Sequence, residues 1–153
     1  MKPRTYSINL DILTSISIKK PFDIRNPIGI EMEYEVLKSD YFLIPHHNIF
    51  NDAGDWLFTT IDTDPKWRGR RPTGKYRATA WIPGNFLSEG LLFVHSLLFT
   101  LKPMTIQFAL KDAVSFQVID SIEGDSARGD WAGSMRGAVR PLLKWTNYHE
   151  PFN

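Results

Sequence analysis

The feature of this sequence that most constrains its fold is a repeated alternation of apolar and polar residues. The alternation is cleanest over residues 28–36, where five apolar side chains are separated by a glycine and three glutamates: Ile28, Ile30, Met32, Tyr34 and Val36 against Gly29, Glu31, Glu33 and Glu35. Successive side chains of a β-strand point to opposite faces. The segment therefore predicts a half-buried strand whose glutamates form a solvated face.

Runs of this kind recur along the chain, separated by residues that favour turns. We predict strands over residues 8–12, 28–36, 47–50, 56–61, 76–82, 91–100, 114–118 and 138–145. No segment sustains the 3.6-residue period of an amphipathic helix. The pattern indicates an all-β fold, an antiparallel sandwich or barrel of about eight strands. Pro141 has no amide hydrogen, so we expect the last strand at a sheet edge or a bulge.

The composition is that of one domain, residues 1–153, in which we treat residues 146–153 as a tail. The chain has 153 residues, of which 42% are hydrophobic and 23% charged, and it is long enough to bury a core. It has no cysteine, which excludes disulfides, thiolate zinc sites and cysteine nucleophiles. The net charge of +1 differs from the basic excess of nucleic-acid binders, so we expect no nucleic-acid partner. The longest apolar run, residues 90–101, is shorter than the ~20 residues of a membrane helix, and we expect no secretory signal at the start.

Motifs associated with catalysis or metal binding are incomplete. The sequence Gly-Arg-Arg-Pro-Thr-Gly-Lys at 69–75 matches the start of a phosphate-binding P-loop. That motif then requires Ser or Thr and a helix, whereas Tyr76 follows and the next residues alternate like a strand. His46 and His47 are adjacent, so a strand would direct them to opposite faces and away from a shared metal. We find no Gly-x-Ser-x-Gly motif, and we expect no catalytic residue, metal or cofactor.

The tryptophans give the strongest indication of a binding surface. Trp81 falls on the polar side of its predicted strand together with Arg77. An exposed ring beside polar groups suits stacking on the apolar face of a sugar, while the polar groups bind its hydroxyls. If the assumed strand parity holds, Glu33, His95 and Gln117 lie on neighbouring strands of the same face, and these five residues form a carbohydrate site. The alternative is that each tryptophan packs in the core or beneath a loop.

Five blocks of sequence occur in an order typical of one family. They are DIRNPIGIEMEY at 23–34, GKYRATAWIPGNFL at 74–87 with Glu-Gly at 89–90, VSFQVID at 114–120, GDSARGDWAG at 124–133 and VRPLLKW at 139–145. The IPGN and VRPLL-x-W segments are the most specific. Through these blocks, residues 6–145 resemble the C-terminal domain of Wzt-type ATP-binding subunits, which belong to ABC transporters that export O-antigen and related polysaccharides.

The resemblance implies a β-sandwich of immunoglobulin-like or jelly-roll topology that binds the exported glycan without changing it covalently. It implies the transporter's nucleotide-binding domain and membrane permease as partners in polysaccharide export and lipopolysaccharide biosynthesis. It places the domain in the cytoplasm, peripheral to the inner membrane. Family members dimerise through an exchanged C-terminal strand, here residues 139–145, so a homodimer is expected. The family's ATPase domain is absent from this chain, and we expect no enzymatic activity.

Two alternatives stand beside this interpretation. The chain is a dimerisation or assembly module of the transporter without direct sugar binding, or, as a weaker alternative, a glycan-modifying enzyme. The resemblance assigns no ligand residue, because glycan specificity differs between members. The shared blocks are expected to secure the fold instead, with Asp125, Arg128 and Asp130 tying down the long loop at 124–137.

Overall fold

The computed structural model describes residues 8–13, 21–39, 41–101 and 104–152. Within them the chain forms eight strands and one short 3₁₀ helix. In chain order these are β1 (Ile8–Leu13), β2 (Phe22–Asp23), β3 (Ile28–Val36), β4 (Leu43–Asn51), β5 (Trp56–Ile61), the 3₁₀ helix η1 (Pro65–Trp67), β6 (Gly74–Ile82), β7 (Gly90–Leu101) and β8 (Met104–Ile119). No helix in these ranges is long and apolar enough to cross a membrane.

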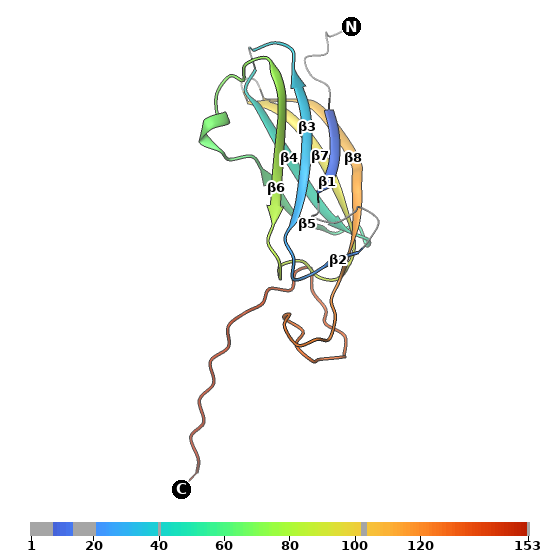
Figure 1. Cartoon of the computed structure of the whole chain (residues 1–153), viewed down its shortest axis with the longest axis vertical. Coiled ribbons are helices and arrows are strands. Elements are labelled where there is room, and N and C mark those ends of the chain that lie inside the picture. The colour runs from blue at the N-terminus through green and yellow to red at the C-terminus, as the bar shows by residue number, and fades with distance from the viewer. Residues whose placement is uncertain (1–7, 14–20, 40, 102–103, 153) are drawn as a thin grey trace.

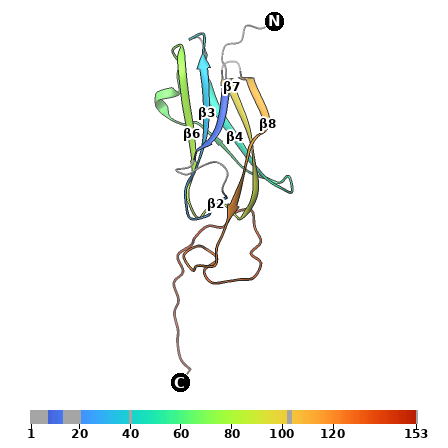
Figure 2. The same cartoon turned by 45° about the vertical axis from the view of Figure 1, so that its right-hand side comes forward.

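The strands form two sheets that face each other (Figures 1 and 2). The smaller sheet has the order β1-β3-β6 and the larger has the order β2-β8-β7-β4-β5. Every pair is antiparallel except β2–β8, which is parallel. The predicted all-β sandwich is therefore confirmed. Strands β5 and β6 are the edge strands on one side of the sandwich, where both line a common groove.

Strand β3 lies at the centre of the smaller sheet because it pairs with β1 on one side and with β6 on the other. Its register with β6 places Ile30 opposite Ala80 and Met32 opposite Ala78. The apolar side chains of β3 are all buried, as the alternation predicts. The parity predicted for residues 28–36 and 76–82 is thus confirmed.

The core between the sheets consists of two groups of buried apolar side chains. The larger group joins β3 to the middle of the other sheet and includes Ile28, Ile30, Ile49, Val94 and Phe116. The smaller group comprises Met32, Tyr34, Val36, Leu43 and Leu98. Burying an apolar side chain of this size contributes about 1.5–3 kcal/mol relative to leaving it exposed.

Strand β8 begins at Met104, whereas the sequence predicts a strand only from residue 114. The register shifts in its middle, because Val94 pairs with Val114 but Ser96 pairs with Leu110. Three residues of β8 therefore lie opposite the single residue His95, which makes a β-bulge. At the bulge Asp112 has a φ of 49°, in the left-handed region. Apolar residues alternate before the bulge as well, at Met104, Ile106, Phe108 and Leu110, so the sequence carries a strand signal there that the prediction from residue 114 did not include.

The prediction of a strand over residues 138–145 is wrong. In the described chain Val139 forms an isolated bridge with Leu87, and the Arg140 amide donates to the Phe86 carbonyl at 2.8 Å. Pro141 follows at once and has no amide to donate. One more backbone hydrogen bond, from the Leu142 amide to the Asn85 carbonyl at 3.2 Å, ends the pairing in the described chain. Beyond it the chain runs away from the sandwich as an extended, exposed tail (Figure 1).

Candidate functional site

Three of the five predicted site residues lie together on the outer face of the smaller sheet. Glu33 of β3 is in register with Arg77 of β6, and Gly29 is in register with Trp81. Arg77 and Trp81 are four residues apart on one strand, so both point outward. The Trp81 side chain is 61% exposed. This face therefore combines an open aromatic ring with charged hydrogen-bonding groups.

Arg77 is held by two glutamates of the adjacent strand. Its Nε donates to Glu33 Oε1 at 2.8 Å and lies 3.3 Å from Glu31 Oε1. The hydrogen bond that Arg77 donates to Glu33 and the charges of both glutamates raise the pKa of Arg77. Glu31 is only 5% exposed, which differs from the solvated face expected for it. It is covered because β3 is a central strand whose outer face has neighbours on both sides.

The Trp81 ring lies across Gly29. A Cβ atom added at Gly29 would come within 3.0 Å of two ring carbons of Trp81. The missing side chain of glycine thus leaves room for the indole on the sheet surface, with its other face toward solvent. Packing in the core, the alternative considered for this tryptophan, does not apply to Trp81.

His95 and Gln117 lie on the outer face of the larger sheet, on the opposite side of the sandwich from Trp81. The His95 ring stacks on Phe50 with centroids 4.1 Å apart, and its Nε2 lies 2.8 Å from Asp112 Oδ1. The expectation that these two residues neighbour Arg77 is wrong. The chain pairs β3 with β6 but β7 with β8, and these pairs belong to different sheets.

None of the five tryptophans, all of which lie in described residues, is buried. Trp56 is 61% exposed on β5 and packs beside Phe50. Trp131 and Trp145 are exposed in the C-terminal segment. Trp67 of η1 is half-buried, with its ring edge-on to Tyr76. The hydrophobic core is instead aliphatic for the most part.

The structure adds a groove that the sequence did not reveal. It lies between the edge strands β5 and β6, with a volume of about 630 Å³. Thr60 and Asp62 line it from one side, and Trp67, Tyr76 and Ala78 line it from the other. A signal was present in the sequence, because alanines at inward positions of a strand leave space that larger core residues would fill.

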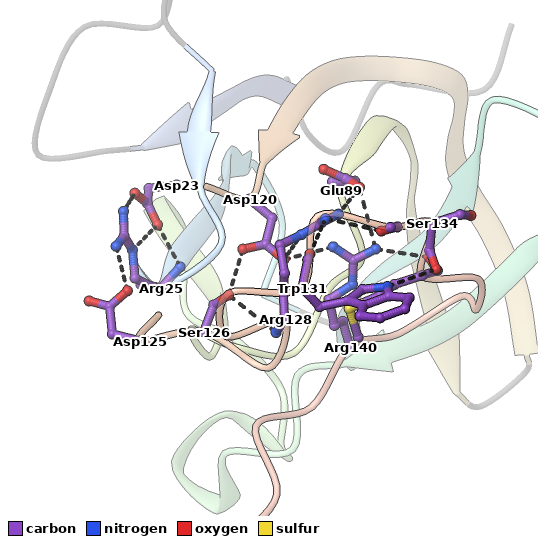
Figure 3. A network of polar contacts seen from close by, with 12 residues as sticks. Asp23, Arg25, Glu89, Asp120, Asp125, Ser126, Arg128, Trp131, Ser134 and Arg140 are labelled. Atoms are coloured by element: carbon purple, nitrogen blue, oxygen red, sulfur yellow. Dashed lines mark hydrogen bonds and ion pairs between the residues drawn. The ribbon is translucent and has the colours of Figure 1, made fainter. Parts of the chain in front are cut away.

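A network of ion pairs fixes the long loop after β8 (Figure 3). The Asp120 carboxylate accepts hydrogen bonds from Ser126 Oγ at 2.6 Å and from Arg140 at 2.7 Å. Arg128 binds Glu89 at 2.7 Å and lies 3.5 Å from Asp120. Burial raises the pKa of the Asp120 carboxyl, but these hydrogen bonds and the two arginine charges outweigh it and hold the pKa below its usual value.

The loop is also tied at its other end. Asp125 Oδ1 lies 2.6 Å from the guanidinium of Arg25, which also pairs with Asp23 and Glu123. The expectation that Asp125 and Arg128 secure this loop therefore agrees with the geometry. Asp130 is exposed and takes no part in the network that the described residues form.

Within the described ranges, no three His, Asp or Glu side chains are grouped so that they could hold a metal ion. The residues at 69–75 lead into strand β6, which begins at Gly74, and a strand rather than a helix follows them. The P-loop mechanism needs such a helix to receive phosphate. Both outer faces and the groove present aromatic rings, hydroxyls and ion-paired side chains.

These features define an all-β sandwich domain with polar and aromatic surfaces on both sheets. The structure is similar to the crystal structure of the C-terminal domain of Wzt, with a TM-score of 0.69 over 94% of this chain and 84% of that chain. The sequence identity is 14%, so the similarity establishes a shared fold. A structural-genomics target, SoR45, aligns at a TM-score of 0.31 and 10% identity over 95% of this chain and 97% of its own. No family model and no curated protein matches the chain.

Proposed function

We propose that this chain is a non-catalytic domain that binds an exported polysaccharide of the O-antigen type for an ABC transporter. The fold shared with the Wzt C-terminal domain supports this proposal most strongly. In the proposal the domain works in the cytoplasm at the periphery of the inner membrane. Its partners there are the nucleotide-binding domain and the membrane permease of the transporter.

The proposed contact surface is the outer face of the smaller sheet. The exposed ring of Trp81 stacks on the apolar face of a sugar, as aromatic side chains in binding sites do. Arg77 and Glu33 supply donors and acceptors for hydroxyl groups from the same face. His95 and Gln117 provide a further proposed contact on the opposite sheet, reached only by a chain that passes around the sandwich.

The test is replacement of Trp81 by alanine. Titration with cell-surface polysaccharide purified from the source organism, followed by calorimetry, should show affinity reduced by about tenfold, the effect of losing roughly 1.4 kcal/mol of stacking. Because the ring is exposed, the free energy of unfolding should change by less than about 1 kcal/mol. Trp131→Ala is the matched control, since Trp131 is 59% exposed but lies in the loop after β8, away from both proposed contacts. A folded wild-type domain that does not bind this polysaccharide would contradict the proposal.

A second function, dimerisation or assembly, is favoured by the C-terminal tail. Leu142, Leu143 and Trp145 are exposed, and Trp145 reaches 81%. Exposing such a run of apolar side chains to water costs free energy in a monomer. A partner surface that covers these side chains removes that cost. We infer a homodimer in which residues 139–145 of each chain pack on the other. Analytical ultracentrifugation should show a dimer at micromolar concentration, and a monomer at every concentration would refute it.

A further inference from the structure

The groove between β5 and β6 is open because of the residues that face it. On β6 the inward positions carry Ala78 and Ala80, whose small side chains leave space between the sheets at this edge of the sandwich. Across the groove, Thr60 and His47 point inward as polar residues where a sandwich core is normally apolar. Its volume of about 630 Å³ lies within the roughly 300–1,000 Å³ typical of small-molecule sites.

A buried arginine forms the back of this groove. Arg71 is 3% exposed, and its guanidinium carbon lies 5.4 to 5.7 Å from the ring centroids of Tyr34, Trp67 and Tyr76. It donates to the Tyr34 hydroxyl, and its nearest carboxylate is that of Asp62 at 3.5 Å. The Nε of Arg71 has no acceptor within the described residues. Arg71 thus has one long ion pair and an Nε donor without an acceptor, and a buried guanidinium with an unused donor favours a further acceptor nearby.

The chain around the groove is strongly basic. Residues 66–77 contain six of the eighteen lysines and arginines and no aspartate or glutamate. Lys75 and Arg77 are paired with glutamates of β3 on the outer face. Lys66, Arg68 and Arg70 belong to none of the ion pairs formed by the described residues. Asp62 and Asp64 also line the groove, so the positive charge is a local excess on the side of Arg71 and β6, where it favours a ligand of the opposite charge.

We propose that this groove binds a sugar unit that carries an anionic group, either a carboxylate or a phosphate. Trp67 and Tyr76 contact the ring of the sugar, the Thr60 hydroxyl donates or accepts a hydrogen bond at its hydroxyls, and the Asp62 carboxylate accepts one. The anion lies in the positive potential of Arg71 and of the basic loop. This inference rests on the proposed function and specifies the chemical class of the glycan.

The experiment compares one polysaccharide before and after its charges are removed. Cell-surface polysaccharide from the source organism is used native, after reduction of its carboxylates to alcohols, and after removal of phosphate esters by mild hydrofluoric acid. Calorimetry should show affinity reduced by about tenfold for one of the two treated samples. Loss after carboxylate reduction identifies a uronic acid, and loss after acid treatment identifies a phosphate. Equal affinity for all three samples would overturn the inference.

Variants then assign the effect to the groove. Ala78→Leu fills the groove without removing a charge and should lower the affinity for the native glycan by about tenfold. The matched control is Ala109→Leu, the same substitution at an exposed position of β8 that does not line the groove. Lys66→Gln and Arg70→Gln are exposed substitutions that should each weaken binding roughly threefold and reduce its dependence on NaCl concentration. These two variants keep the test decisive if Ala78→Leu fails to fold.

The two proposals fail in different ways. If Ala78→Leu, Lys66→Gln and Arg70→Gln bind the native glycan normally while Trp81→Ala does not, the groove inference is wrong and the proposed function stands. If the folded wild-type chain binds no form of the polysaccharide, the proposed function itself is wrong, and the groove inference with it.

Discussion

His47 is an ionisable residue placed inside the sandwich. It is buried, its Nδ1 lies 2.8 Å from the hydroxyl of buried Ser96, and burial together with the charge of His46 lowers its pKa to about 4. In the unfolded chain a histidine has a pKa of about 6.5, so between pH 6.5 and pH 4 the unfolded state binds more protons. Stability therefore falls as the pH is lowered through this window.

From these values we predict a loss of about 3 kcal/mol in the free energy of unfolding between pH 7 and pH 4 from His47 alone. Urea denaturation at a series of pH values measures it, and His47→Gln should remove most of the slope between pH 6.5 and pH 4. The lowered pKa of Asp120 acts at lower pH, since its contribution is lost only below its usual value near 4. An unchanged slope in His47→Gln would contradict this assignment.

Asp120 is the residue on which the C-terminal network depends. Its side chain is 0% exposed, and two arginines, Arg128 and Arg140, rely on it for charge balance. We predict that Asp120→Asn lowers the free energy of unfolding by about 3–5 kcal/mol, because it leaves buried cations with only the partly exposed Glu89. Glu123→Gln is the control, because it removes an exposed ion pair with Arg25 and should cost less than about 1 kcal/mol.

At the scale of the elements, the turn between β6 and β7 packs against the segment that leads from β2 into β3. A Cβ atom at Gly84 would lie 2.1 Å from the Arg25 carbonyl oxygen, and the neighbouring Asn85 amide donates to the Ile24 carbonyl at 2.6 Å. We predict that Gly84→Ala lowers the free energy of unfolding by about 2 kcal/mol, measured by urea denaturation. Gly69→Ala, where nothing lies within 4 Å, should change it by less than about 0.5 kcal/mol.

The elements differ in how well the sequence predicted them. Strand β3 was predictable because every outward position after Gly29 is a glutamate, including Glu31, which is buried in the structure. Strand β8 was predicted only from residue 114, although apolar residues alternate from Met104 to Leu110 in the same parity and only Asp112 at the bulge departs from the pattern. Strand β2 is two residues long and pairs in parallel, so no period exists to detect. The predicted C-terminal strand has apolar residues, but in the described chain its only bridge is the one between Val139 and Leu87.

For the whole molecule, alternation specifies which way a side chain points from its own sheet but not which sheet it belongs to. That is why Arg77 and Glu33 were correctly placed together while His95 and Gln117 were not. The groove was missed for a related reason. Its walls come from β5, η1 and β6, and they meet only because the sheet orders leave both edge strands on one side.

The tail provides a prediction for the whole molecule. A chain that ends after Leu142 keeps Arg140 in its ion pair with Asp120 and keeps the hydrogen bond from the Leu142 amide to the Asn85 carbonyl at 3.2 Å. It loses Leu143 and Trp145, the exposed side chains through which the proposed dimer forms. We therefore expect this shortened chain to unfold at the same urea concentration as the full chain at high dilution. In analytical ultracentrifugation it should remain a monomer at concentrations where the full chain is a dimer.

A shortened chain that still dimerises would assign the contact to another surface. One that also loses polysaccharide binding would show that the glycan site requires two copies of the domain.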